Sequence, residues 1–288
     1  MQQRPFRQID VFSHHPGFGN PVAVVLDAQG LSDADMRRFA AWTNLSETTF
    51  LMPPTAAGHA AGADYRLRIF SPRGELPFAG HPTLGTCRAW LQQGHTPRVP
   101  GLVVQESAQG LVQIEHQGET LAFAAPPLQR SKPSPALVPL VASALGLRPH
   151  QIRATQLLDN GPVWLGLLLD SADTVLGLTP DHARLKDLGQ DVGVIHIAPD
   201  AGADPERPGA VVRAFAAPMG NPEDPVTGSL NASLAQWLIA EGLAPTRYLV
   251  AQGECLGRAG RVYIRQDAQG QVWVGGHTVT CIEGTALL

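Results

Sequence analysis

Glu47 is the residue of this 288-residue chain whose type and setting best suit proton transfer, and His81 and Asp224 stand where two helices are expected to begin. Glu47 lies in NLSETTF (residues 44–50), among hydroxyl-bearing and apolar side chains and without a charged neighbour. We expect its carboxyl group to face a cleft, where partial loss of solvent raises the pKa from about 4.3 toward neutrality, as general acid–base catalysis requires. The alternative is an ordinary surface glutamate at the boundary between a helix and a strand.

Two segments of the chain, each carrying one of the other two residues, resemble each other. RIFSPRGELPFAGHPTLGT and RAFAAPMGNPEDPVTGS share Arg-x-Phe, a proline and a glycine soon after, and then x-Pro-x-x-Gly-Thr/Ser. One spacing of 143 positions (224 minus 81) separates four pairs of residues: His81 and Asp224, Pro82 and Pro225, Gly85 and Gly228, and Thr86 and Ser229. We therefore predict a duplication with pseudo-two-fold symmetry and a cleft between the halves. Coincidence between two turns rich in glycine and proline is the competing interpretation.

Each of these segments predicts the start of a helix. Proline is preorganised for the first helical position, so we expect Pro82 and Pro225 to occupy it. His81 and Asp224 then become the N-caps, although plain capping by Asp224 is the alternative to a functional role. Helix N-termini carry partial positive charge and unsatisfied N–H groups, so two of them across one cleft would bind a small acid. The expected donors are the backbone N–H groups of Thr83, Leu84, Val226 and Thr227 and the hydroxyls of Thr83, Thr227 and Ser229.

The rest of the sequence predicts a strand-rich wrapping around these two helices. Alternating segments such as DYRLRIF indicate strands with one buried face. Residues 32–45 predict an amphipathic helix with Ser32 as its N-cap. The two helices that carry AWL and QWL are apolar nearly all round, and a helix without a polar face is buried. We therefore expect each of them to run through the middle of its half of the chain.

A proline-rich segment predicts where the two halves are joined. Residues 126–140 contain five prolines and suggest a linker. The expected domains are residues 1–127 and 128–288, with the C-terminal strand near 275–288 as a candidate addition to the first.

Composition argues against several classes of protein. A net charge of −4 without a basic run disfavours nucleic acid as a partner, and no apolar run approaches the ~20 residues of a membrane helix. The N-terminus lacks the apolar core of a signal peptide, and three widely spaced cysteines form no disulfide framework, so we expect a cytoplasmic protein. The histidines give no HxxxH pattern, and no nucleotide-binding glycine motif occurs, so we expect neither a metal nor a cofactor.

Several motifs together resemble one known family. FGNPVAVV, NLSETTF, ELPFAGHPTLGT, EDPVTGS, QGECLGRAGR and VWVGGHTV occur in the order found in the phenazine-biosynthesis PhzF-like isomerases, across essentially the whole chain. The resemblance implies the diaminopimelate epimerase-like fold, an α+β fold of two pseudo-symmetric domains, each a strand-rich, barrel-like wrap around a central apolar helix. It also implies a cofactor-free, homodimeric enzyme that acts on a small carboxylic acid, as in the isomerisation of a dihydro-3-hydroxyanthranilate by moving a proton.

Carried over residue by residue, the resemblance implies that Glu47, His81 and Asp224 are catalytic. Glu47 would take a proton from a carbon beside a conjugated system and return it elsewhere on the same face, while His81 and Asp224 orient amino or hydroxyl groups of the substrate. A scheme with Glu47 and Asp224 as two bases stays open. Amides at the helix N-termini would bind the ring carboxylate. The predicted substrate-binding residues are Ser46, Gly80, Thr83, Thr227, Gly228 and Ser229.

Two other functions remain as alternatives. One is a cofactor-independent racemase or epimerase of an amino or hydroxy acid. The wider fold includes racemases with two cysteine bases, but position 79 is alanine and EDPVTGS holds no cysteine, so a two-thiol mechanism lacks support. We expect Cys255 and Cys281 to be packing residues. The other is a non-catalytic binder of small acids; Glu47 argues against it, because a binder of anions gains nothing from an acid in its cleft.

Overall fold

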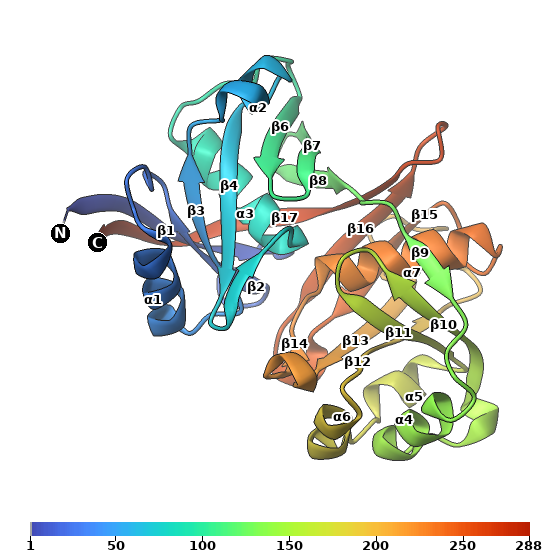
Figure 1. Cartoon of the computed structure of the whole chain (residues 1–288). Helices are drawn as coiled ribbons and strands as arrows, with labels where there is room; N and C mark the ends of the chain where they lie inside the picture. Colours follow the sequence, from blue (N-terminus) through green and yellow to red (C-terminus); the bar gives the residue numbers. More distant parts are fainter. Residues whose placement is uncertain (1) are drawn as a thin grey trace. The chain divides into compact units, whose positions relative to one another are not determined.

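In the computed structural model, which describes residues 2–288, the chain forms two units of mixed strands and helices (Figure 1). Unit 1 comprises the chain up to Ala124 together with Gly275–Leu288, and unit 2 comprises Ala125–Val274. The proline-rich segment is only partly a linker. It contains a short strand, Gln129–Ser131, which pairs with the strand that follows it in the chain, and it also contains the first turn of the helix Leu137–Leu145. Within residues 2–288, no helix has the length and apolar character needed to cross a bilayer.

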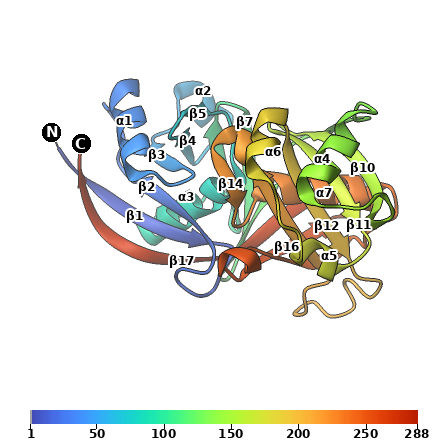
Figure 2. The ribbon, with the colours of Figure 1, turned by 90° about the horizontal axis from the view of Figure 1, so that it is seen from below.

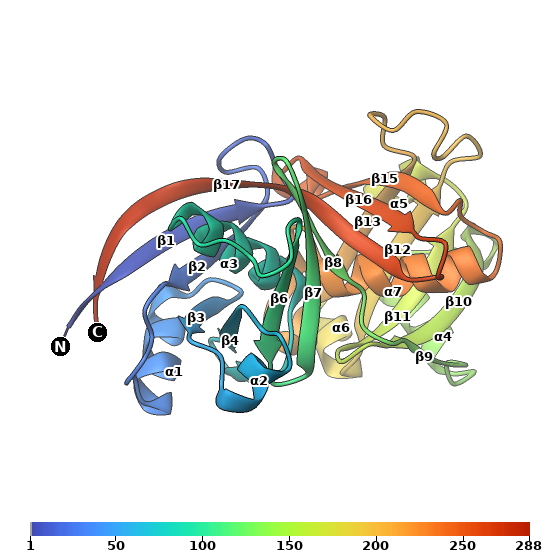
Figure 3. The ribbon, with the colours of Figure 1, turned by 90° about the horizontal axis from the view of Figure 1, so that it is seen from above.

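Unit 1 is a closed ring of strands around one helix. The ring runs β17–β1–β2–β3–β4–β6–β7–β8 and returns to β17. Figures 2 and 3 show β17 following β1 along its length, which brings the two ends of the chain together. The elements are β1 (Gln3–Val11), β2 (Asn20–Val25), α1 (Asp33–Thr43), β3 (Thr48–Met52), α2 (Ala56–Ala60), β4 (Tyr65–Ser71), β5 (Gly74–Leu76), α3 (Gly80–Gln92), β6 (Leu102–Ser107), β7 (Gly110–Gln117), β8 (Thr120–Ala124) and β17 (Val272–Leu287).

Unit 2 wraps a second helix in the strand series β9–β10–β11–β12–β13–β15–β16. Smaller helices cover the outer part of this sheet (Figure 1). The elements are β9 (Gln129–Ser131), α4 (Leu137–Leu145), β10 (Ile152–Asp159), β11 (Val163–Leu169), α5 (Ala172–Leu176), α6 (His182–Leu188), β12 (Asp191–Ile197), β13 (Ala210–Ala216), β14 (Asn221–Asp224), α7 (Gly228–Ala240), β15 (Arg247–Gln252) and β16 (Gly260–Gln266), with 3-10 turns at Pro149–Gln151, Ala217–Met219 and Glu254–Leu256.

The duplication inferred from the sequence is present as the same order of elements in both units. β4–β5–α3–β6–β7 matches β13–β14–α7–β15–β16. In each series the second strand is antiparallel to the first, the strand after the helix is parallel to the first, and the last strand is antiparallel again. Each central helix has 13 residues and is almost entirely buried, as its apolar sequence predicts.

Glycines allow close contact between each central helix and its sheet. A Cβ atom at Gly85 of α3 would lie 2.3 Å from Cγ1 of Val22 on β2. In unit 2 the glycine lies on the sheet instead: a Cβ atom at Gly193 of β12 would lie 2.2 Å from Cδ1 of Leu230 on α7. In both units a residue without a side chain lets the helix and a strand approach closely, on the helix in unit 1 and on the strand in unit 2.

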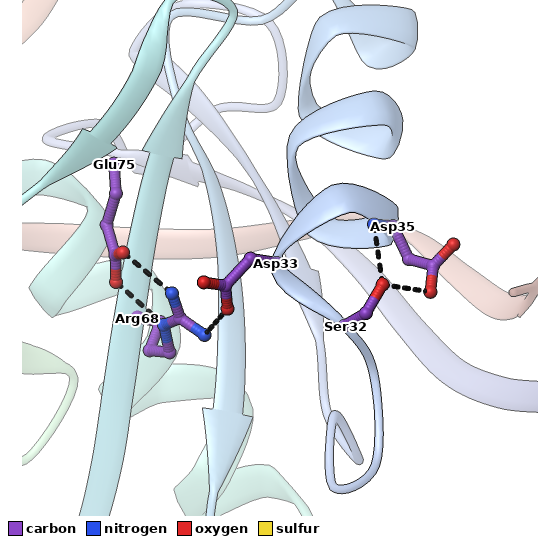
Figure 4. A network of polar contacts seen from close by, with 5 residues as sticks. All are labelled: Ser32, Asp33, Asp35, Arg68 and Glu75. Atoms are coloured by element: carbon purple, nitrogen blue, oxygen red, sulfur yellow. Dashed lines mark hydrogen bonds and ion pairs between the residues drawn. The ribbon is translucent and has the colours of Figure 1, made fainter.

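The shared Arg-x-Phe pattern forms the same contact in both units. Arg68 lies over the ring of Phe70 and binds both carboxylate oxygens of Glu75, each at 2.7 Å. Arg68 also reaches Asp33 at 2.7 Å, in the first turn of α1, beside the Ser32 hydroxyl that caps this helix as predicted (Figure 4). The strand pair β4–β5 is thereby tied to the start of α1.

In unit 2 the equivalent arginine is more deeply buried. Arg213 lies over the ring of Phe215 and binds Glu223 at 2.9 and 2.8 Å. The Arg213 and Glu223 side chains are 6% and 7% exposed, against 15% and 32% for Arg68 and Glu75.

We predict that Arg213→Met destabilises the protein by about 3–5 kcal/mol, because it leaves the Glu223 carboxylate buried without its counter-charge. Arg68→Met is the matched control and should cost clearly less, because its carboxylate partners are more exposed to water. Removing both partners in Arg213→Met/Glu223→Met should restore part of the loss. Urea unfolding of the four proteins measures this, and equal losses for the two single arginine variants would contradict it.

Candidate active site

Glu47 and His81 lie next to each other in unit 1. Glu47 is in the loop between α1 and β3, and His81 is the second residue of α3. β3 runs parallel to β2, and its first residue, Thr48, lies beside Ala23 in the middle of β2, so the Ala23 N–H donates to the Glu47 carbonyl at 3.5 Å. Oε2 of Glu47 is 3.3 Å from Nε2 of His81, and the side chains are only 13% and 6% exposed. The structure thus brings two of the three predicted catalytic side chains together.

The imidazole of His81 is held in one neutral form. Burial lowers its pKa to about 3, against the opposing effect of a hydrogen bond to the backbone of Pro21. Proline has no N–H, so the ring must donate to the Pro21 carbonyl. Nε2 makes no hydrogen bond within residues 2–288, so the donor is Nδ1. The lone pair of Nε2 therefore points toward the glutamate.

This tautomer decides how the pair can share a proton. A carboxylate oxygen and an unprotonated imidazole nitrogen are both acceptors, so a hydrogen bond across the 3.3 Å gap needs a proton on Glu47. With that proton the carboxyl group is an acid, and without it a base, while the ring stays neutral. The pair suits the uptake and return of a single proton in a site largely closed to water.

The helix starts differ from those predicted for His81 and Asp224, and both N-cap predictions are wrong. α3 begins at Gly80 after an extended Ala79 (φ −152°, ψ 137°), which makes Ala79 the N-cap and places His81 and Pro82 inside the first turn. α7 begins at Gly228 with Thr227 as its N-cap. Asp224 ends β14, where it pairs with Ala214, so the chain cannot yet turn into a helix.

The predicted N–H donors shift accordingly. Thr83 N–H donates to the Ala79 carbonyl at 3.2 Å, and Thr227 N–H donates to Oε1 of Gln252 at 3.1 Å, so neither is available to a ligand. Leu84 is the fifth residue of α3, and its N–H has a partner within the helix. The first-turn amides without an acceptor in their own helix are those of Gly80, His81, Gly228, Ser229 and Leu230.

Asp224 lies in unit 2 as part of a different polar cluster. Its side chain is half-buried, and both carboxylate oxygens accept hydrogen bonds. Oγ1 of Thr227 donates to Oδ2 at 2.5 Å, and Nδ2 of Asn221 donates to Oδ1 at 3.3 Å. Asp224 therefore faces donors, whereas Glu47 faces the lone pair of an imidazole.

The six predicted substrate-binding residues divide between the units. Ser46 and Gly80 accompany Glu47 and His81 in unit 1, while Thr227, Gly228 and Ser229 accompany Asp224 in unit 2. Thr83 is fully buried and its hydroxyl accepts from Nε2 of Gln105 at 3.1 Å, inside unit 1. Ser229 is half-buried and its hydroxyl accepts from the indole of Trp164 at 3.3 Å.

Sequence reasoning missed Pro21 and Gln252, although both lie in motifs that carry the family resemblance, FGNPVAVV and QGECLGRAGR. Cys255 and Cys281 are exposed, which makes their prediction as packing residues wrong. In the part of the chain that the structure describes, no cluster of three or more His, Cys, Asp or Glu side chains could hold a metal ion.

One family of known proteins matches the chain over almost its whole length. The model of the phenazine biosynthesis-like protein family, PhzC-PhzF, matches residues 9–284. The chain belongs to this family. It is 35% identical to Antisense-enhancing sequence 1 of Schizosaccharomyces pombe, with 100% of both chains covered, and 33% identical to the trans-2,3-dihydro-3-hydroxyanthranilate isomerase of Pseudomonas aeruginosa, with 97% of this chain and 98% of the relative covered.

Solved structures confirm the fold class. A PhzF-family phenazine biosynthesis protein from Bacillus anthracis superposes with a TM-score of 0.83 at 23% identity, over 100% of both chains. A probable proline racemase from Agrobacterium radiobacter gives a TM-score of 0.64 at 14% identity, over 99% of this chain and 93% of that one. The PhzF-like chain therefore has the predicted diaminopimelate epimerase-like fold.

We predict that the neutral His81 makes the protein less stable as the pH falls. The folded pKa of about 3 lies below the ordinary value of 6.5, so between these values the unfolded chain binds a proton that the folded protein excludes. His81→Asn keeps a donor for the Pro21 carbonyl and removes the titration. The unfolding free energy of the wild type relative to this variant should fall by about 1.4 kcal/mol per pH unit within that window. Urea titrations across it measure the slope, and a wild type that gains relative stability on acidification would refute a neutral His81.

Proposed function

We propose that this PhzF-like protein is a cofactor-independent isomerase that moves one proton within a small carboxylic acid by general acid–base catalysis. The observation that carries the proposal is the buried contact of Glu47 with a neutral, tautomer-fixed His81. Membership of a family with a trans-2,3-dihydro-3-hydroxyanthranilate isomerase among its members supports a substrate of that type or a related one.

In the proposed reaction Glu47 is the proton carrier. It takes a proton from a carbon beside a conjugated system and returns it to another carbon on the same face. His81 accepts a hydrogen bond from the protonated form, which holds the carboxyl group in place between the two transfers. Because the imidazole stays neutral, it does not compete for the proton.

The substrate carboxylate would bind the unsatisfied amides at the first turns of α3 and α7, where the helix dipoles favour negative charge. That groups of both units act on one substrate molecule stays a prediction from the sequence. Ser46, Gly80, Gly228 and Ser229 would line this site, and Thr83 and Thr227 would support it from behind. The homodimer and the cytoplasmic location implied by the family resemblance remain predictions.

A racemase or epimerase of the same fold is the second candidate, favoured by the fold likeness to a proline racemase. A two-thiol mechanism has little physical basis in this chain. Cys87 is buried, and burial raises its pKa to about 12, while Cys255 and Cys281 are exposed. A racemase here would have to use carboxyl groups.

We predict that Glu47→Gln lowers turnover by about 10³-fold or more while ligand binding is retained, because the amide cannot carry the proton. The assay is an absorbance scan with trans-2,3-dihydro-3-hydroxyanthranilate in deuterated buffer, with NMR of the product to locate the incorporated deuterium. Glu119→Gln, an exposed glutamate of the same unit, is the matched control and should keep wild-type turnover.

The outcomes separate the candidates. Deuterium at the α-carbon of amino or hydroxy acids, with no shift of a double bond, would favour the racemase. Equal turnover by the wild type and Glu47→Gln would remove Glu47 as the carrier. Binding of small acids without turnover by either protein would point to a non-catalytic binder.

A further inference from the structure

Gln252, at the end of β15, is a buried amide that joins both ends of the segment carrying Asp224. It is 1% exposed. Its Nε2 donates to the Asp224 carbonyl at 3.1 Å and to Oγ1 of Thr227 at 3.0 Å. Its Oε1 accepts from the Thr227 N–H at 3.1 Å and from Nδ2 of Asn231 at 2.8 Å. One side chain thus fixes the turn between β14 and α7.

The directions of the hydrogen bonds of Gln252, Asn231 and Thr227 are determined. The Thr227 N–H can only donate, so it fixes Oε1 of Gln252 as the acceptor and Nε2 as the donor. Asn231 is fixed in the same way, because its Nδ2 also donates to the Thr227 carbonyl at 2.8 Å. The Thr227 hydroxyl oxygen accepts from Gln252, and its single proton has the Asp224 carboxylate as its partner at 2.5 Å.

We propose that Gln252 is a positioning residue that aims the Thr227 hydroxyl at Asp224, so that Asp224 serves as an ionised acceptor for a donor group of the substrate and not as a second proton-transferring base. This role of Gln252 rests on the function proposed above. An ionised Asp224 favours one class of substrate, small carboxylic acids that also carry an ammonium or hydroxyl group. The ammonium is preferred because it forms the stronger hydrogen bond to a carboxylate.

The alternative direction leaves a group unpaired. If Asp224 carried a proton and donated it to Thr227, the threonine hydroxyl would keep its own proton while its oxygen accepted from both sides. Donors facing both carboxylate oxygens favour the charged form. Oε2 of Glu47 lies instead against Nε2 of the neutral His81, so the two carboxyl groups are suited to different tasks.

Unit 1 supplies a matched control residue. Gln105, on β6, is fully buried and accepts from the Tyr65 hydroxyl at 3.1 Å while its Nε2 donates to Thr83 at 3.1 Å. It follows its central helix as Gln252 follows α7, but its hydrogen bonds reach no carboxylate.

The test follows the Asp224 carboxyl carbon by ¹³C NMR in the substrate-free protein, with Asp224→Asn to assign the signal. We expect Thr227→Val and Gln252→Met to move the Asp224 titration upward by about one pH unit, a tenfold change in its proton affinity. Thr227→Ser keeps the hydroxyl and should restore the wild-type midpoint. Gln105→Met should leave it unchanged. Should Gln252→Met fail to fold, the Thr227 pair decides the question alone.

An Asp224 titration that is the same in the wild type and Thr227→Val would overturn the proposal, whatever the activity. In kinetic assays, Thr227→Val should raise KM by about tenfold with a smaller effect on kcat. In the pH profile of kcat/KM, the midpoint of the acid limb should move to higher pH. A loss confined to kcat would instead identify Asp224 as a proton-transferring group. Because the NMR titration needs no substrate, its result does not depend on the result of the Glu47→Gln assay. Failure of the Gln252 proposal can therefore be distinguished from failure of the proposed function.

Discussion

The burial of two helices that have no polar face is the constraint on which the rest of this structure depends. A helix of this kind needs sheet on every side, and each unit provides it by sending parallel strands past the helix and closing them with antiparallel neighbours. A helix enclosed in this way can offer polar groups to a ligand only at its ends. Its first turn then meets the segments at that end of the wrap, which carry Glu47 in the loop before β3 in one unit and Asp224 at the end of β14 in the other.

The two carboxyl groups differ because of what the folded backbone presents to them. In unit 1 the Pro21 carbonyl accepts a hydrogen bond from the imidazole N–H of His81, so the lone pair of the other ring nitrogen points toward Glu47. In unit 2 the Thr227 N–H orients Gln252, and the orientation passes through a hydroxyl to Asp224. In both cases a main-chain group with a fixed donor or acceptor role sets the direction of a side-chain network.

The sequence was sufficient to predict features that depend on local pattern. The apolar faces of α3 and α7, the Ser32 cap and the duplication all follow from residue types within one element or from internal similarity. The N-caps at Ala79 and Thr227 could not be predicted in this way. Pairing of Asp224 with Ala214 keeps Pro225 out of the helix, and the partner of the Thr227 N–H lies 25 positions further along the chain. Long-range pairing overrode the ordinary preference of proline for a first helical turn.

The glycines at the helix–sheet contacts limit how far the two halves can be treated as copies. In one unit the missing side chain belongs to the helix and the bulky partner to the sheet, and in the other the assignment is reversed. A chimera that exchanged only α3 and α7 would separate Gly85 from Val22 and Leu230 from Gly193, so neither helix would meet the strand that leaves room for it. Whoever rebuilds this chain from two identical repeats must therefore transplant each helix together with the strand it rests on.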